Sequence, residues 1–364
     1  MVFQNSSFLW AALRTTGLAT GLLLGVSCTT PTSESVAAAD SWKEEARFLA
    51  LDEGRFYLLP LNNPSTVPAG MAFHMSEADL IAGIEVNGQR RAYPLWILVA
   101  YHVVNDTLDD SPVLLSHCEA CSGASAFRPV LDPFEGKSLT FQIHGIAHGT
   151  FSIYDYQTQT VWSPFTGRTL EGQLHPSRMQ RIPLVLETWG AWVKRFPETE
   201  VVFASRIMVE RREHGRGGHS VLGDPFVPDF FAATANMDDT RLGTGDHVFG
   251  IEAGEAAVAF PLQRLEEEEE ILKYPFQDQF YLIKKISQFG VLAFRLAPEQ
   301  EGSAYHLISE IPFRVVDDRG GVWDEFGNPL SEDPKAQKLV TADGYFTEWY
   351  EWVSSYPQSE IADW

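Results

Sequence analysis

The sequence predicts an α+β fold that is rich in β-strands, with two degenerate copies of one unit packed into a single large globular body. Three observations predict it. Short β-favouring runs alternate polar and apolar residues, only a few stretches have helical spacing, and several motifs occur twice in the same order. Strands and helices come in mixed runs without regular alternation, which favours α+β over a doubly wound parallel sheet.

The expected strands begin with a hairpin. Asn87-Gly88 separates two β-favouring runs, residues 80–86 and 89–95, and this dipeptide is typical of a two-residue turn between antiparallel strands. A short buried strand is expected at residues 113–116, ending at His117-Cys118. Residues 138–145 and 150–155 alternate polar and apolar side chains and are expected to pair.

The expected helices are short. Apolar residues recur at roughly helical spacing in three stretches, residues 94–104, 188–196 and 347–353. The last two stretches share the pattern Trp-x-x-Trp, which connects the helix prediction with the internal repeat.

The repeat is defined by motifs with identical internal spacing. Gly83-Ile84-Glu85 precedes Pro94-Leu95 by the distance at which Gly250-Ile251-Glu252 precedes Pro261-Leu262. The paired tryptophans and the proline that follows them also recur, as Trp189, Trp192 and Pro197 and as Trp349, Trp352 and Pro357. A duplication predicts a first copy at residues 46–205, a Gly-rich connecting segment at 206–240, and a second copy at 241–364.

The N-terminus has the pattern of a lipoprotein-type export signal. Residues 1–28 carry one positive charge, Arg14, followed by a short apolar core that ends in Ser27-Cys28. We expect lipid attachment at Cys28, which would anchor the protein to a membrane of the cell envelope, on the periplasmic side or the cell surface. Residues 29–45 are small and polar and are expected to form a flexible tether.

The charge of the chain limits its partners. The formal net charge is −22, and so acidic a surface repels phosphate backbones, which argues against nucleic-acid binding. A cationic or envelope protein is a more natural partner.

The most informative feature is the pair Cys118 and Cys121, because the second copy contains no cysteine. Two close thiols in an exported protein can be a redox couple, part of a metal site, or an inert pair. A covalent haem link is unfavourable because Ser122, and not His, follows the second cysteine.

Several polar residues of the first copy could complete such a centre. His102 is the main candidate, as a third metal ligand or as a base that assists thiolate formation. Asn105 or Asp106 could orient its imidazole by a hydrogen bond, without binding the metal themselves. Weaker candidates are His117, His144, His148 and Asp155.

These residues lie in motifs that resemble DUF3179, an exported bacterial and archaeal family of unknown function. The resemblance covers roughly residues 70–360. The motifs that carry it are Tyr93-Pro94-Leu95, His102-Val103-Val104-Asn105-Asp106-Thr107, Cys118-Glu119-Ala120-Cys121, Tyr154-Asp155 with Thr158 and Trp162, Phe165-Thr166-Gly167-Arg168, and the first Trp pair with Pro197. His117, Glu119-Ala120 and Ala147-His148-Gly149 depart from the family pattern. The resemblance implies no reaction.

The sequence therefore predicts an envelope lipoprotein with a Cys/His centre, and whether it is an enzyme stays open. The centre would bind copper or zinc through His102, Cys118 and Cys121, or carry out thiol–disulfide exchange with these three residues as its catalytic groups. The alternative is a non-catalytic lipoprotein that binds a ligand or partner and contains a structural Cys118–Cys121 disulfide.

Overall fold

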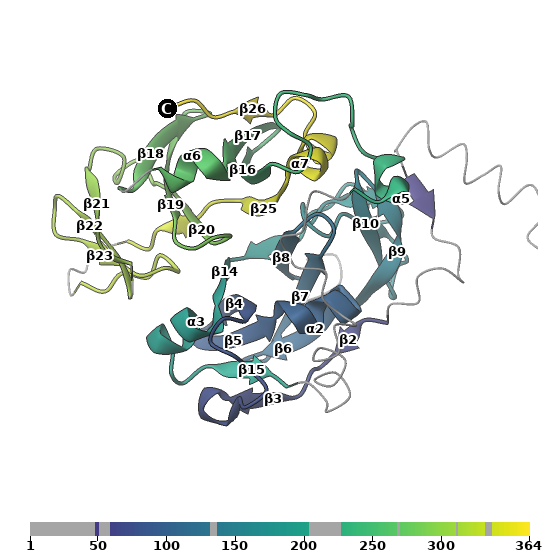
Figure 1. Ribbon diagram of the computed structural model, residues 1–364, viewed down its shortest axis with the longest axis horizontal. Coiled ribbons are helices and arrows are strands. Elements are labelled where there is room, and N and C mark those ends of the chain that lie inside the picture. Colours follow the sequence, from purple (N-terminus) through teal and green to yellow (C-terminus); the bar gives the residue numbers. More distant parts are fainter. Residues whose placement is uncertain are drawn as a thin grey trace, which may run out of the picture. The chain divides into compact units, whose positions relative to one another are not determined.

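The computed structural model describes residues 48–50, 59–131, 137–203, 227–267, 270–310, 312–331 and 337–364. The expected signal, its lipid-carrying Cys28, the tether to residue 45 and most of the Gly-rich connection lie outside the described residues. The fold is β-rich, with several sheets and a few short helices (Figure 1). Within the described parts of the chain, no helix has the length and apolar character needed to span a membrane.

The first sheet has the strand order β14-β4-β5-β15-β3. Its strands are β14 (Leu184–Thr188), β4 (Leu80–Val86), β5 (Gln89–Pro94), β15 (Glu200–Val202) and β3 (Thr66–Pro68). The predicted hairpin is confirmed, since β4 and β5 pair antiparallel around Asn87 and Gly88. Both turn residues have positive φ, 53° and 84°, the backbone form that an Asn-Gly turn provides.

Two further sheets complete the first half of the chain. One has the order β13-β8-β7-β6-β2 and the other β1-β9-β10-β11-β12. The strands of the former are β13 (Gln180–Ile182), β8 (Gly123–Arg128), β7 (Ser111–Cys118), β6 (Val103–Leu108) and β2 (Leu61–Asn62). Those of the latter are β1 (Phe48–Ala50), β9 (Phe141–Ala147), β10 (Thr150–Asp155), β11 (Val161–Trp162) and β12 (Thr169–Glu171). The predicted strand before Cys118 is present but longer, and the predicted pairing of the two strands that became β9 and β10 is confirmed.

Residues 247–361 form three sheets, with the strand orders β25-β16-β17-β26, β18-β19-β20-β24 and β21-β22-β23. These orders match those of the three sheets in the first half of the chain. The strands of the second half are β16 (His247–Ala253), β17 (Ala256–Pro261), β18 (Leu272–Phe276), β19 (Gln279–Lys285), β20 (Val291–Arg295), β21 (Tyr305–Glu310), β22 (Phe313–Asp317), β23 (Val322–Trp323), β24 (Val340–Thr341), β25 (Gly344–Glu348) and β26 (Glu360–Ile361). In the first sheet of this half β16 pairs antiparallel with β17 and β25, and β17 pairs parallel with β26. Strands β4, β5, β14 and β15 pair in the same directions.

The helices are α2 (Leu95–Tyr101), α3 (Trp189–Arg195), α5 (Asp229–Ala232), α6 (Leu262–Glu266) and α7 (Trp349–Ser355), with a 3-10 turn, η1, at Ala69–Met71. The helix expected at residues 94–104 ends at Tyr101, because His102 has φ 62° and Val103 already belongs to β6. Thr188 caps α3 by accepting a hydrogen bond from the Ala191 amide at 3.3 Å.

The repeated Gly and Trp residues contact one another. A Cβ on Gly83 would lie 2.4 Å from the Trp192 ring, and one on Gly250 would lie 2.1 Å from the Trp352 ring. Each indole also donates to a hydroxyl, Trp192 to Thr199 at 3.0 Å and Trp352 to Ser359 at 2.8 Å. The repeated motifs therefore mark one packing arrangement that occurs twice.

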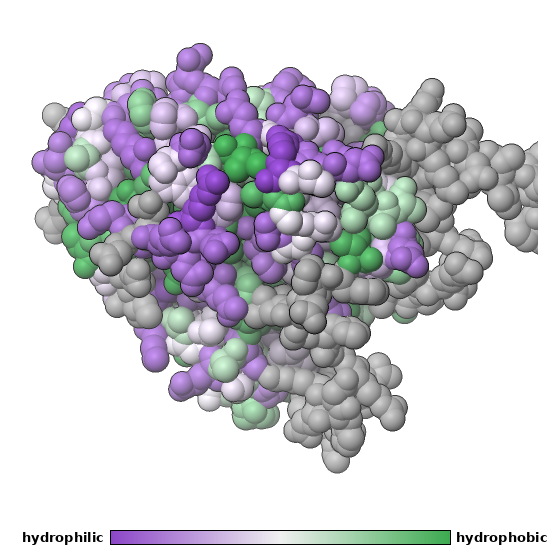
Figure 2. Space-filling view, turned by 45° about the horizontal axis from the view of Figure 1, so that its top comes forward, coloured by the Kyte–Doolittle hydropathy of each residue, from purple (hydrophilic) through white to green (hydrophobic). Residues whose placement is uncertain are grey.

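The apolar cores cross the boundary between the halves. One core contains Cys118, Cys121 and Phe165 from the first half together with Tyr345 and Trp349 from the second. Strand β25 packs against β8 in the same region (Figure 1). On the face shown in Figure 2 most residues are hydrophilic, and apolar residues form small, separate groups.

Candidate functional site

The two cysteines lie at a turn between antiparallel strands. Cys118 is the last residue of β7, Gly123 is the first of β8, and Ser122 has φ 56°. The Cys121 amide donates to the Cys118 sulfur at 3.3 Å. Both cysteines carry free thiols and are buried, with exposed fractions of 1% for Cys118 and 0% for Cys121. The turn therefore encloses two neighbouring sulfurs and directs a backbone N–H at one of them.

Residues of the second half cover this turn. The carbonyl oxygen of Cys121 accepts hydrogen bonds from the Glu348 amide at 3.1 Å and the Thr347 hydroxyl at 3.0 Å. The Tyr350 hydroxyl donates to the Ala120 carbonyl at 3.2 Å. The cysteine turn thus rests on the junction between β25 and the first turn of α7.

This junction carries two buried carboxylates, and Glu348 contacts the cysteine turn directly. Glu348 accepts a hydrogen bond from the Ser122 hydroxyl at 3.1 Å, and Glu351 accepts one from Ser355 at 3.0 Å. The exposed fraction is 6% for Glu348 and 0% for Glu351. Burial raises the pKa of each carboxyl to about 7. In the described part of the molecule neither forms an ion pair with Lys or Arg, and the Oε2 atom of each has no hydrogen-bond partner.

The thiol of Cys121 is influenced by these neighbours. Burial raises its pKa well above the ordinary value, and the Cys118 thiol and the Glu351 carboxylate raise it further. The Thr150 hydroxyl lies 3.5 Å from the Cys121 sulfur. Cys121 is therefore a protonated thiol whose pKa responds to the charge of Glu351, a carboxyl with a pKa of about 7.

Sequence reasoning missed Glu348 and Glu351, although the repeat contained the signal for them. In the second Trp-x-x-Trp motif, Glu348 stands where the first motif has Thr188, and Glu351 stands where it has Ala191. The strand turn matching the cysteine turn lies between β19 and β20, and its Ser287 hydroxyl donates to the carbonyl of Leu186 on β14, the strand before α3, at 2.8 Å. The two carboxylates thus occur at the junction between β25 and α7, which covers the cysteines. The corresponding junction between β14 and α3 has Thr188 and Ala191 in their place.

His102 and His117 are neighbours on adjacent chain segments. The His117 amide donates to the His102 carbonyl at 2.9 Å. The His102 ring lies 5.6 Å from that of Phe151, and His117 Nδ1 lies 2.9 Å from the Gly123 carbonyl. Burial lowers the pKa of His102 to about 4, and burial together with His102 lowers that of His117 to about 3. Both imidazoles are therefore neutral at neutral pH.

The described residues contain no group of three His, Cys, Asp or Glu side chains that could hold a metal ion. The expected set of His102, Cys118 and Cys121 accordingly does not form such a cluster. Each imidazole retains one buried nitrogen without a hydrogen-bond partner in the described structure, Nδ1 of His102 and Nε2 of His117.

Asn105 and Asp106 make contacts that stabilise the sheets. The Asn105 amide group joins β6 to β9 through two 2.8 Å hydrogen bonds with the Phe141 backbone. Asp106 accepts from Arg91 at 2.8 Å and from the Tyr93 hydroxyl at 2.6 Å. Burial and Asp106 raise the pKa of Tyr93 well above its ordinary value. These contacts give both residues roles in the packing of the sheets.

The other three weaker candidates lie around strands β9 and β10. Asp155 accepts hydrogen bonds from the Thr158 amide at 2.6 Å and from the Trp162 indole at 3.0 Å, which explains the spacing of this motif. The His144 ring packs edge-on against Tyr154, with ring centres 5.5 Å apart. His148 has φ 52° in the turn between the two strands. The structure places these three residues in strand and turn packing.

Comparison with known proteins gives one result. No curated protein and no solved structure matches the chain. One family model matches residues 60–360, which is most of the chain, and its description is "Protein of unknown function (DUF3179)". The motifs containing Asp106, Asp155 and the cysteine pair lie within this match. The chain therefore belongs to the DUF3179 family.

Proposed function

We propose that Cys118 and Cys121 form a dithiol–disulfide redox couple, with Glu351 as the proton acceptor for Cys121. The observation that carries this proposal is the docking of the first turn of α7 on the cysteine turn. The first turn of α7 carries Glu351, a buried carboxylate without a cationic partner in the described structure, and its charge raises the pKa of the Cys121 thiol.

The reaction would transfer two electrons from the dithiol to a substrate disulfide. The Cys118 thiolate attacks one substrate sulfur, the substrate S–S bond breaks, and the first substrate thiolate leaves and takes a proton from water. Cys121 then passes its proton to Glu351 and attacks the Cys118 sulfur. This forms the Cys118–Cys121 disulfide and releases the second substrate thiolate, and Glu351 later returns its proton to water.

Glu351 fits the role of base better than His102 does. A proton acceptor works best when its pKa lies near the working pH. The pKa of Glu351 is about 7, whereas that of the buried His102 imidazole is about 4, so His102 is a weak proton acceptor. The Cys121 amide at 3.3 Å would stabilise a thiolate at Cys118.

The burial of both sulfurs determines how a substrate could reach them. With exposed fractions of 0–1%, neither sulfur can be attacked while α7 covers the turn. Exchange therefore requires this contact to open, and the opening equilibrium should control the rate.

We further propose that the chain arose by duplication, with copies at residues 46–205 and 241–364. The matching strand orders and the two Gly–Trp contacts support this. In this proposal the first copy contains Cys118 and Cys121. The second copy contributes Glu348, Glu351 and the helix α7 that covers the cysteine turn. The proposed location, anchored to the cell envelope through a lipid on Cys28, rests on the N-terminal sequence alone.

Thiol reactivity of the folded protein tests the proposal. Tyr350→Phe removes the hydrogen bond to Ala120, worth about 1 kcal/mol, and should speed reaction with a disulfide reagent about fivefold. The matched control is Tyr305→Phe, which removes a 3.1 Å hydrogen bond from a buried tyrosine to the Gln300 carbonyl away from the cysteines. It should leave the rate unchanged.

Glu351→Gln should slow formation of the Cys118–Cys121 disulfide from the mixed disulfide by at least about tenfold, and Glu348→Gln should slow it less. If both variants slow disulfide formation equally, Glu351 has no specific role as the proton acceptor. A pair that stays oxidised in reductant until the protein unfolds would favour the structural disulfide and the binding function. Stoichiometric copper or zinc that is lost in Cys118→Ser would favour the metal site.

A further inference from the structure

A second candidate site lies at a pocket of about 790 Å³ next to the start of β25, whereas the cysteine turn contacts the end of that strand. It does not depend on the proposed redox function. The pocket is lined from β13, the end of β16, the β18–β19 turn, β20 and β24. Its volume is within the usual range for small-molecule sites. Gln180, Gln277, Gln279 and Tyr281 contribute uncharged polar groups to the lining.

The charged lining residues are mostly cationic. They are Arg178, Arg181, Arg295 and Lys338, against the two carboxylates Glu252 and Asp343. The whole chain has the opposite balance, with 27 Lys and Arg against 49 Asp and Glu. The positive excess is therefore a local property of the pocket.

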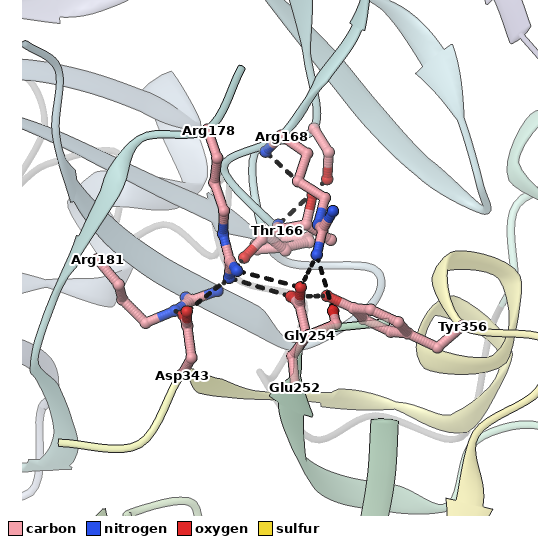
Figure 3. A network of polar contacts seen from close by, with 10 residues as sticks. Thr166, Arg168, Arg178, Arg181, Glu252, Gly254, Asp343 and Tyr356 are labelled. Carbon is pink, nitrogen blue, oxygen red and sulfur yellow. Dashed lines mark hydrogen bonds and ion pairs between the residues drawn. The ribbon is translucent and has the colours of Figure 1, made fainter. Parts of the chain in front are cut away.

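The two carboxylates are engaged with arginines (Figure 3). Arg178 donates to both oxygens of Glu252, at 3.1 and 3.0 Å, and lies 2.8 Å from Asp343 Oδ2. Arg181 Nε lies 2.9 Å from Asp343 Oδ1. Glu252, which is 5% exposed, also accepts from Tyr356 at 2.6 Å and from Arg168. These carboxylates neutralise and position Arg178 and Arg181.

Arg295 and Lys338 are in a different situation. Both are exposed, and within the described ranges neither forms an ion pair. Arg295 pairs with Val340 across β20 and β24, and Lys338 lies two residues before β24. Arg181 lies on β13, and Arg178 lies two residues before that strand. Cationic side chains from two separate parts of the fold thus line the pocket.

We propose that this pocket binds a small polyanion carrying carboxylate or phosphate groups. Arginine and lysine recognise such groups through charge-assisted hydrogen bonds, and a concave, positively charged wall raises the local anion concentration. Arg295 and Lys338 would contribute charge that the protein does not neutralise. The positioned guanidinium groups of Arg178 and Arg181 would offer their remaining N–H donors.

Titration calorimetry on the full-length protein with citrate and with pyrophosphate tests this site, and glucose serves as the neutral control. Arg295→Gln and Lys338→Gln should each weaken anion binding about fivefold to tenfold, and added salt should weaken it as well. Lys194→Gln, which removes an exposed cation on α3, should have no effect. Tighter binding of citrate would indicate a carboxylate ligand, and tighter binding of pyrophosphate a phosphate ligand.

Three outcomes would overturn the proposal. They are no binding of either anion at millimolar concentration, unchanged affinity in both pocket variants, and equal weakening by Lys194→Gln. The cysteines are not involved in this experiment, so its result is separate from that of the thiol measurements.

Discussion

Asp106 shows how a polar residue in a family motif can serve the fold. Its carboxylate is buried, accepts from Tyr93, and forms an ion pair with Arg91. Arg91 also pairs with Glu200, whose side chain is 44% exposed. One cation therefore has one buried and one solvent-exposed partner, and the two carboxylates should differ in their importance for stability.

We expect Asp106→Asn to lower the free energy of unfolding by about 3 kcal/mol, because it leaves the buried Arg91 charge with less compensation. The matched change Glu200→Gln should cost less than about 1 kcal/mol, since water screens an exposed pair. Urea unfolding measures both. Similar losses for the two variants would contradict this assignment.

The two carboxylates at the cysteine turn should make stability depend on pH. The pKa of Glu348 and of Glu351 is about 7 in the folded protein, above the ordinary value of 4.5. The folded state therefore holds protons that the unfolded state has lost between these pH values. The stability that these groups contribute is complete below about pH 4.5 and is lost as the pH rises through 7.

Urea unfolding between pH 4.5 and 8 measures this effect. The free energy of unfolding should fall over this range by on the order of 2 kcal/mol for each group. In the double variant Glu348→Gln and Glu351→Gln, this part of the fall should disappear. If the stability of the double variant depends on pH in the same way as that of the wild type, other groups cause the fall.

At the scale of secondary-structure elements, the Gly–Trp contact joins a strand to a helix in each half. Gly83 lies on β4 and Gly250 on β16, and each is covered by the second tryptophan of the helix that follows β14 or β25. A side chain at either position would have to displace a fully buried indole. This steric requirement explains why glycine and tryptophan repeat together.

We expect Gly83→Ala and Gly250→Ala each to lower the free energy of unfolding by at least about 2 kcal/mol through overpacking. Gly70→Ala is the control, because a Cβ there meets no atom within 4 Å. Thermal unfolding followed by tryptophan fluorescence would detect the difference. Tolerance of alanine at both packed positions would argue against the contact.

The length of the strands was predicted less well than their existence. The hairpin turn and the β9–β10 pair follow from local patterns, whereas β7 extends from Ser111 to Cys118 on both sides of the predicted strand. Pairing with β6 and β8 stabilises these additional residues. Such pairing is a non-local interaction that propensity alone does not contain.

At the scale of the whole molecule, the two halves should unfold together. Each of the three large cores combines residues from both halves, for example Ile84 with Ile251 and Trp192 with Phe313. The cysteine turn is covered by α7, which follows it by more than 200 residues. Neither half can therefore keep its apolar surface buried alone.

We expect calorimetry of the intact protein to show one cooperative transition, and residues 46–205 expressed alone to be unfolded with reactive thiols. Far-UV circular dichroism and thiol titration of that fragment provide the check. Two separate transitions, or a folded fragment with protected thiols, would show that the halves are independent domains.

Local sequence patterns were enough to predict the β-rich character, the Asn-Gly hairpin, the repeated Gly and Trp motifs and the presence of a close thiol pair at Cys118 and Cys121. These features depend on residues close together in the chain, whose local geometry follows from their own chemistry. What surrounds the cysteines depends on the tertiary structure. Glu348 reaches that turn from more than 200 residues away, and Asp106 contacts Arg91 and Tyr93, because such contacts depend on how the sheets pack, which no local pattern encodes.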